Sequence, residues 1–372
     1  MSVANPFLSV IVPAHRGEAV LRRSLPALLA SDLDRSAWEL IVVDDASGDG
    51  TPLVAAEYAD LVVRLEGTPR GPAGARNRGA EAARGEVLVF IDADVCVHGD
   101  VLGSMADAFH ADPGLSALFG SYDADPTAPG LVSQFRNLLH HHVHQLNPGG
   151  AETFWAGCGA VRRAAFMEVG MLDAGRFPRP QIEDIELGRR LRRAGHRIEL
   201  RPDIQCTHLK RWTLRNMVVT DYRDRGVPWM LLLLEEGPAR SSATLNLRFD
   251  QKASTALVGL AALAVAAALV LRATAPLLVA AAAVLAVVLL NHRFYALLVR
   301  ARGAAFALAA VPLHLIFYFT GGVAGVAGTL LFHTKRRRPA RSASIEGNDV
   351  APLAGRPVDR ERVGVSGVRG PE

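Results

Sequence analysis

Two carboxylates one residue apart, Asp92 and Asp94, are the residues of this chain best placed to do chemistry. They follow the stretch 85–91, whose β-branched and aromatic residues are typical of a buried strand. Side chains alternate along an extended chain, so both carboxylates can face the same way, and such oxygen ligands suit one Mg²⁺ or Mn²⁺ that also binds phosphate oxygens. The alternative is an ordinary turn in which an aspartate caps the next element.

The first 90 residues alternate short apolar strands with helices. Strands are predicted over 7–13, 40–45, 61–65 and 85–91, and helices over 18–29, 52–58 and 71–83. This alternation predicts a parallel sheet with helices on both faces. Ligands of such sheets bind at the carboxyl ends of the strands, which is where Pro13, Asp44 and Asp45 fall together with the two later aspartates. The agreement favours a functional site over a chance turn.

Composition narrows the class of protein. Half of the 372 residues are hydrophobic and the mean hydropathy is +0.18, which allows a large core and some membrane segments. The net charge of +4 is too small and too scattered to indicate nucleic-acid binding. Cys96, Cys158 and Cys206 are far apart and lack CxxC spacing, which fits a reducing compartment rather than disulfides or a zinc site. The apolar segment 7–12 is too short for a signal peptide, so we expect a cytosolic first domain.

A dinucleotide-binding Rossmann domain shares the predicted architecture and has to be considered. Its glycine fingerprint is best matched by the stretch 48–53. This stretch lacks the third glycine and places Asp49 where a pyrophosphate would approach. We therefore reject a nicotinamide-dependent dehydrogenase.

Two features of the middle of the chain have open interpretations. The predicted helix 131–146 carries His140, His141 and His144 off its apolar face; these could bind a metal, form a polar helix face or contact an acceptor. Trp155 stands in a loop of small residues, where it either packs in the core or stacks against a sugar or acceptor.

Acidic residues open the predicted helix that follows residue 182. Acids in a first helical turn are commonly capping and dipole partners. That interpretation accounts for Glu183 and Glu186 more easily than for all three acids including Asp184.

The order of these pieces resembles the family 2 glycosyltransferases, which have a GT-A fold. The resemblance spans about residues 8–212 and is carried by the opening Ser9-Val10-Ile11-Val12-Pro13-Ala14, Val43-Asp44-Asp45-Ala46-Ser47, Ala75-Arg76-Asn77, Asp92-Ala93-Asp94, Glu183-Asp184 and Arg211-Trp212. It implies a mixed, mainly parallel sheet. It also implies that Pro13 and Asp45 line the nucleobase pocket and that Arg76 lies near the nucleobase and diphosphate. Asp92 would face the ribose, Asp94 hold the metal and Asp184 act as the catalytic base.

The implied chemistry agrees with the residue types. A nucleotide-diphosphate leaving group gathers negative charge, which a cation held by Asp94, helped by Arg76 or Arg78, would stabilise. Asp184 on the acceptor side can take the proton of the attacking hydroxyl. One direct displacement inverts the anomeric centre. Trp155, Glu183, Arg211 and Trp212 are candidate acceptor-side residues.

One departure from the family concerns the segment 208–212. Processive members carry Gln-x-x-Arg-Trp, whereas this chain has His208 in the first place before Arg211 and Trp212. The change argues against synthesis of a long polymer. It leaves His208 as a metal or diphosphate contact, or as a structural histidine.

The last third of the chain is apolar. Segments 254–271, 274–290 and 304–332 are long enough for about three membrane crossings, although the first two are rich in alanine and could form a shallow hairpin. Basic clusters lie between the second and third segments and after the third, at 335–338. Both clusters would prefer the cytoplasm, yet a single third crossing would separate them, so either the last segment re-enters at Thr320-Gly321-Gly322 or the positive-inside rule is broken here. A helix near 227–234 is expected to lie at the membrane surface.

These observations predict a catalytic domain over 1–225, an interfacial linker over 226–252, transmembrane helices over 253–333 and a disordered basic tail over 334–372. The expected function is that of an inverting, metal-dependent glycosyltransferase of the plasma membrane with its catalytic domain in the cytoplasm. It would use a nucleotide-diphosphate sugar, with a UDP-sugar as first choice, and a lipid-linked or envelope acceptor. One alternative is a polyprenyl-phosphate sugar synthase. Another is a non-catalytic nucleotide-binding membrane sensor or export subunit, which would need no acceptor-side base.

Overall fold

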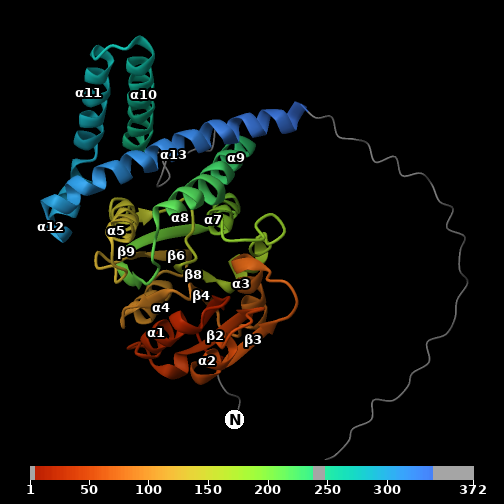
Figure 1. Cartoon of the computed structure of the whole chain (residues 1–372). Helices are drawn as coiled ribbons and strands as arrows, with labels where there is room; N and C mark the ends of the chain where they lie inside the picture. Colours follow the sequence, from red (N-terminus) through yellow and green to blue (C-terminus); the bar gives the residue numbers. More distant parts are fainter. Residues whose placement is uncertain (1–4, 238–247, 338–372) are drawn as a thin grey trace, which may run out of the picture.

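A nine-stranded sheet forms the centre of the predicted catalytic domain in the computed structural model, which describes residues 5–237 and 248–337 (Figure 1). Its strands are β1 (Leu8–Ala14), β2 (Trp38–Asp45), β3 (Leu61–Leu65), β4 (Val87–Ile91), β5 (Val95–Val97), β6 (Leu115–Tyr122), β7 (Gly149–Gly150), β8 (Cys158–Arg162) and β9 (Arg197–His208). They are ordered β3-β2-β1-β4-β8-β6-β9-β5, with β7 paired to β9.

The sheet is mixed, as the sequence predicts. Pairings among β1, β2, β3 and β4 are parallel, whereas β8 enters antiparallel between β4 and β6. Parallel and antiparallel pairings are equal in number, four of each. Because β1 lies between β2 and β4 in parallel register, the carboxyl ends of these three strands meet at one edge.

Helices cover both faces of the sheet because its strands are apolar on both sides. One face packs on α1 (Glu18–Leu29), α2 (Thr51–Tyr58) and α4 (Val101–Ala111), the other on α3 (Gly71–Ala82), α6 (Arg163–Glu168) and α7 (Glu183–Arg193). The alternation along β1 is direct: Val10 and Val12 are buried on the first side and Ile11 on the second. A short turn, η1 (Arg35–Ala37), precedes β2.

A third apolar cluster joins the catalytic domain to the C-terminal helices. It includes Phe135 of α5 (Leu131–Gln145), Trp212 and Met217, which packs from α8 (Leu214–Val219). Phe294 and Leu298 complete it from α12 (His292–Arg302), together with alanines of α13 (Ala304–Arg337). The wide helical segment η2 (Thr220–Gly226) then leads into α9 (Val227–Glu236). The C-terminal helices are thus docked on the catalytic domain.

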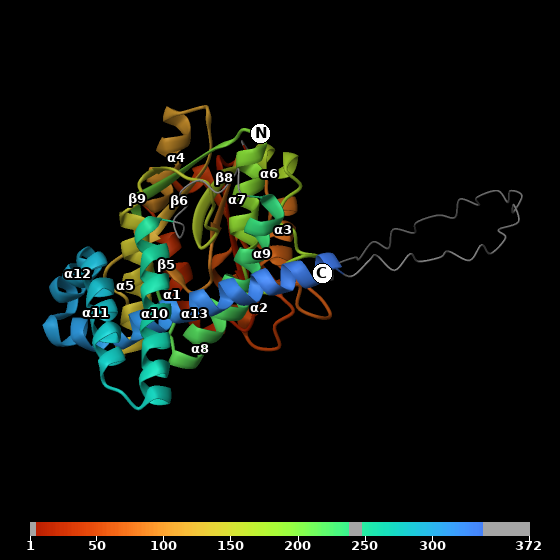
Figure 2. The ribbon, with the colours of Figure 1, turned by 90° about the horizontal axis from the view of Figure 1, so that it is seen from above.

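The C-terminal helices do not run parallel to one another. α10 (Phe249–Leu271) and α11 (Ala275–Leu290) form a hairpin that stands away from the catalytic domain, while α13 runs across that domain past α9 (Figures 1 and 2). By length and composition, α10 and residues 304–334 of α13 can each cross a membrane, and α11 with α12 qualify only as a pair bent by 72°. The structure thus has two candidate spans, or three with the bent pair. The tail predicted from 334 lies outside the described residues beyond 337.

Candidate active site

A cavity of about 1490 Å³ opens at the carboxyl ends of β1, β2 and β4. We call it the catalytic cavity. It contains ten of the eleven predicted site residues: Pro13, Asp45, Arg76, Asp92, Asp94, Trp155, Glu183, Asp184, His208 and Trp212. Arg211, the eleventh, is exposed and does not line the cavity. Residues far apart in the sequence therefore share one chamber.

The end of the cavity beside Pro13 is fixed by Asp45. Its two carboxylate oxygens accept hydrogen bonds from the backbone amides of Arg70 and Gly71, both at 2.8 Å. Gly71 has a φ of +75°, and a Cβ on it would lie 2.4 Å from the carbonyl oxygen of Pro178. Only glycine fits there, which lets the start of α3 and the segment before α7 close over this end.

Arg76 connects three elements of the cavity wall. Its buried guanidinium donates to Asp92 at 2.5 Å and to Glu183 at 3.1 Å. Glu183 also accepts the backbone amide of Gln181 at 2.8 Å. Glu183 therefore faces Arg76 from the first turn of α7, and the pair holds α3, β4 and α7 together. Burial raises the pKa of Asp92, with Arg76 opposing and the charge of Asp94 adding to the rise.

Asp94 and His208 present an oxygen and a nitrogen side by side. The Oδ2 of Asp94 lies 3.5 Å from Nε2 of His208, whose Nδ1 lies 2.7 Å from the amide oxygen of Asn137. The His208 ring also stacks on Tyr122 with centroids 4.3 Å apart. Burial would raise the pKa of Asp94, but the hydrogen bond from His208 and the charge of Lys210 bring it below its usual value.

This pair fits a divalent cation. Since the Asn137 oxygen can only accept, it keeps the proton on Nδ1, and loss of the Nε2 proton then leaves a lone pair beside Asp94. In residues 5–237 and 248–337, no three His, Cys, Asp or Glu side chains are grouped to hold a metal by themselves. Two protein ligands plus phosphate oxygens and water match the preference of Mg²⁺ or Mn²⁺.

Asp184 is held at the start of α7. Its Oδ2 accepts the amide of Ala156 at 3.1 Å and its Oδ1 the amide of Ile185 at 2.8 Å. A Cβ on Gly188 would lie 2.2 Å from the backbone nitrogen of Phe154, so glycine there lets α7 approach the loop that carries Ala156. Burial, then the charge of Glu183, raises the pKa of Asp184 to about 6, with Arg76 opposing. Such a carboxylate suits proton abstraction near neutral pH.

The histidines of α5 form an aromatic wall behind Trp155. The Trp155 ring meets His140 and His144 edge-on at 5.0 and 5.3 Å and Tyr122 at 4.8 Å. Burial lowers the pKa of His144 to about 4 and that of His140 well below its usual value, so both rings are neutral. The wall is thus apolar in character and uncharged.

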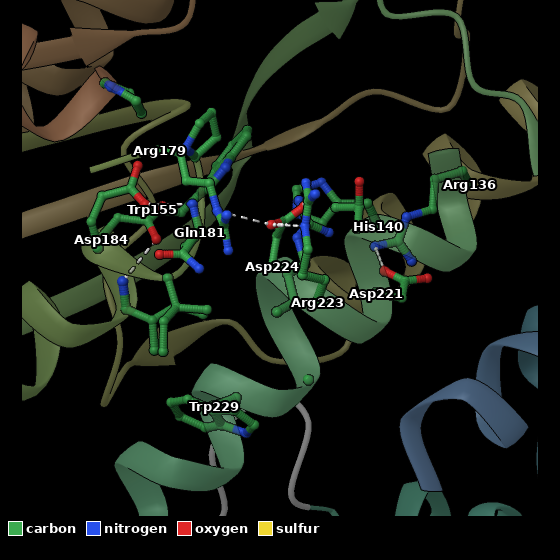
Figure 3. Close-up of a pocket in the computed structure, with 18 of the residues that line it drawn as sticks. Arg136, His140, Trp155, Arg179, Gln181, Asp184, Asp221, Arg223, Asp224 and Trp229 are labelled. Atoms are coloured by element: carbon green, nitrogen blue, oxygen red, sulfur yellow. Dashed lines mark hydrogen bonds and ion pairs between the residues drawn. The ribbon is translucent and has the colours of Figure 1, made fainter. Parts of the chain in front are cut away.

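Several cations of the cavity are absent from the sequence predictions. Arg136 of α5 is buried and pairs with Asp221 at 2.6 Å (Figure 3). Its guanidinium lies 5.6 Å from the Trp212 ring, and the amine of Lys210 lies 4.4 Å from the same ring. Arg225 also lines the cavity. Lys210 adjoined a recognised motif and could have been found there. Arg136 lies in a predicted helix and belongs to no motif, so the sequence did not mark it as a site residue. Only the position of α5 in the structure brings it to the cavity.

The sheet edge, the paired aspartates and the acid at the start of α7 together have the arrangement expected of a GT-A fold. Comparisons agree. Residues 9–170 match the family described as glycosyl transferase family 2. The N-terminal part of this chain is therefore similar to family 2 glycosyltransferase domains.

Relatives match only parts of the chain. Glycosyltransferase AglE of Haloferax volcanii is 33% identical over 102 residues, which cover 26% of this chain and 34% of AglE. The probable glycosyltransferase YdaM of Bacillus subtilis is 26% identical over 215 residues, 53% of this chain and 49% of YdaM. The structure of mannosyltransferase PcManGT from Pyrobaculum calidifontis, in complex with GDP-Man and Mn²⁺, superposes with a TM-score of 0.54 at 20% identity, covering 90% of this chain and 88% of PcManGT. That likeness shows the shared fold.

Proposed function

We propose that this protein is an inverting, metal-dependent glycosyltransferase that moves a sugar from a nucleotide-diphosphate donor to a lipid-linked or envelope acceptor at the cytosolic face of the plasma membrane. The observation that carries the proposal is the position of Asp184. Its carboxylate, with a pKa raised to about 6, lines the same cavity as Asp94 and His208. A protein that only binds a nucleotide has no use for a base poised in this way.

The donor would occupy the end of the cavity lined by Pro13, Asp45 and Arg76. Asp94 and His208 would hold Mg²⁺ or Mn²⁺, and PcManGT, which shares the fold, was solved with GDP-Man and Mn²⁺. When bound, the cation supplies charge neutralisation of the diphosphate leaving group. Asp45 and Arg76 hold the walls of this end in place through the bonds described above. A UDP-sugar remains the first donor to test.

Asp184 would perform the proton transfer. As the acceptor hydroxyl oxygen bonds to the anomeric carbon, its proton passes to a carboxylate oxygen of Asp184 and the bond from that carbon to the diphosphate oxygen breaks. Attack occurs on the face opposite the leaving group, so one displacement inverts the configuration. The amides of Ala156 and Ile185 orient the carboxylate during this step.

The acceptor end of the cavity supports a lipid-linked acceptor. Apolar and small residues line it from three helices: Trp229, Met230 and Leu233 of α9, Ala256 of α10, and Phe317, Val326 and Leu330 of α13. Such a lining suits a hydrocarbon chain. Arg136, Lys210 and Arg225 line the same cavity, and Lys210 interacts with the charge of Asp94. These cations favour a phosphate on the lipid, which keeps the polyprenyl-phosphate sugar synthase as the second candidate.

The experiment that tests the proposal uses the full chain in nanodiscs of bacterial lipid extract. We expect it to hydrolyse one nucleotide sugar of a panel faster than the others, only with Mg²⁺ or Mn²⁺, and to label a lipid from that donor. Asp184→Asn serves as the catalytic control. Nucleotide binding without turnover of any donor would instead identify a sensor or export subunit.

Membrane attachment has its own test. α10 and α13 expose large apolar side chains along their lengths, for instance Leu269 at 75% and Leu308 at 75%. We expect the full chain to stay in the membrane pellet through high salt and through carbonate extraction, because burial of such side chains in lipid does not depend on charge. Release by carbonate would contradict an integral protein. A variant that ends after Gly237 is the control for attachment through the C-terminal helices.

A further inference from the structure

α13 is the longest helix in the described part of the chain, with 34 residues from Ala304 to Arg337. Its composition alone would make it a membrane-crossing helix. Yet Figure 1 shows it transverse to the α10–α11 hairpin and laid along the catalytic domain, and Figure 2 shows the same course from above. The contacts of α13 decide whether it crosses the membrane or lies along the membrane surface.

The start and the middle of α13 are attached to the catalytic domain. Arg302, two residues before α13, donates to Gln134 at 2.7 Å and pairs with Asp125 at 3.0 Å. Further along, the ring of Phe317 lies 5.6 Å from the guanidinium of Arg136. These partners belong to α5 and the loop before it.

The far part of α13 is attached to the same domain through α9. A Cβ on Gly328 would lie 2.8 Å from Cβ of Met230 and 3.2 Å from the carbonyl oxygen of Val227, so the two helices pack closely there. α9 is in turn fixed to the catalytic domain, because Glu235 pairs with Arg176 at 2.6 Å and Glu236 accepts from Arg189 at 2.8 Å. Arg189 belongs to α7, the helix that begins beside Asp184.

The attached stretch is too long to cross a bilayer. From residue 302 to residue 328 there are 26 residues, or about 39 Å of helix at 1.5 Å each, against a hydrocarbon core of about 30 Å. If α13 crossed, Asp125 at one end and Glu236 near the other would have to lie at opposite faces. The charged catalytic domain between them would then fill the bilayer, which its many ionised side chains forbid.

We propose that α13 lies in the plane of the membrane surface on the side of the catalytic domain, with its outer face in lipid, and that the α10–α11 hairpin alone penetrates the bilayer. The side chains on the outer face of α13 suit contact with lipid. Its exposed side chains Leu308, Phe319, Val323, Val326 and Leu330 follow helical spacing along one stripe, and none is polar. Val326 and Leu330 also line the cavity, yet they remain 63% and 62% exposed. The opposite stripe is packed on protein, with small residues such as Ala307, Ala324 and Gly328 alternating with larger buried ones such as Leu313 and Tyr318.

The base of the hairpin agrees with this arrangement. Asn291, at the 72° bend between α11 and α12, donates to Ser254 at 2.9 Å and accepts from Tyr318 at 2.8 Å. The hairpin is thereby tied to the middle of α13. The basic residues of α12 and the basic end of α13 then fall on one side of the membrane. The conflict that a third crossing creates for the positive-inside rule disappears.

The test uses single cysteines in a Cys96→Ser background, since Cys158 and Cys206 are buried. Asp107→Cys, exposed on α4, marks the side of the catalytic domain, and Thr334→Cys reports the end of α13. A membrane-impermeant maleimide is added to sealed vesicles of each orientation. We expect both thiols to react in the same preparation and neither in the other. Reaction of Thr334→Cys only in the opposite preparation would overturn the proposal, and detergent-opened vesicles confirm that each thiol is reactive.

A depth measurement provides a second, independent readout. Nitroxide labels are placed on the outer face of α13 at Leu308, Phe319 and Leu330, with Leu285 of α11 as the reference inside the bilayer. An in-plane helix predicts equal, shallow depths at the three α13 sites and a greater depth at Leu285. A crossing helix predicts that Phe319 is deep while Leu308 and Leu330 are shallow, which would contradict the proposal. Neither readout depends on transferase activity.

Discussion

Replacement of Asp184 by asparagine is expected to lower the rate of sugar transfer by about 10²-fold or more while donor affinity stays near that of the wild type. Asparagine keeps the size of the side chain, and its single carbonyl oxygen can still accept from one of the amides of Ala156 and Ile185, but its NH2 group cannot accept from the other and it has no basic carboxylate. The loss should therefore appear in kcat rather than in donor binding. The measurement is transfer at saturating donor, with donor affinity from calorimetry.

The neighbouring acid gives a contrasting variant. Glu183 is paired with Arg76, so Glu183→Gln leaves part of the Arg76 charge unbalanced beside Asp92. We expect this variant to change donor KM more than kcat. Equal, small effects at both positions would refute the assignment of Asp184 as base. A small effect of Asp184→Asn together with robust transfer to a lipid phosphate would instead identify the second candidate, because a phosphate oxygen is already ionised and needs no base.

The pH dependence follows from the same group. The pKa of Asp184 is raised to about 6, chiefly by burial, and only the ionised form can accept a proton. Transfer should therefore be nearly constant above about pH 7, fall to about half near pH 6 and drop about tenfold per pH unit well below it, as protonation removes the base. In Asp184→Asn the residual rate should lose this slope. A wild-type profile that is flat from pH 7 to 4.5 would contradict the role.

The donor half of the site could be predicted from sequence because its residues end consecutive parallel strands. Asp45 and Asp92 follow buried runs, and the geometry of a parallel sheet alone brings such positions together. The partner of Arg76 could not be found in this way. Glu183 lies 107 residues away on α7, and only the folded sheet brings it to 3.1 Å. The spacing of apolar residues predicts local helices and strands, but it does not predict which distant side chains will pair.

The orientation of α13 shows a different limit of sequence reasoning. Hydropathy measures whether a segment tolerates lipid, and the stripe of Leu308 to Leu330 satisfies it whether the helix crosses or lies flat. What separates the two cases is packing on the catalytic domain through small residues such as Gly328. In a hydropathy average over a stretch of sequence, glycine and alanine count only as weakly apolar residues. Their role as a protein-contact face appears only once α9 is in place.

Loss of Asp94 is expected to abolish metal-dependent donor binding. In Asp94→Ala, His208 is left as the one protein ligand beside a diphosphate, and one ligand of a small set cannot retain Mg²⁺ or Mn²⁺ at useful concentrations. Calorimetry with UDP or the preferred nucleotide, with and without Mn²⁺, should show that the variant has lost the increment that the metal gives the wild type.

The matched variant is Asn137→Leu. It removes the acceptor that holds the proton on Nδ1 of His208 but leaves both proposed ligands, Asp94 and His208, in the chain. We expect it to weaken metal-dependent binding by about 10- to 100-fold, the usual cost of losing a partner that orients a metal ligand. Unchanged Mn²⁺-dependent binding in Asp94→Ala would remove the metal role. An effect of Asn137→Leu equal to that of Asp94→Ala would show that His208, rather than Asp94, dominates the site.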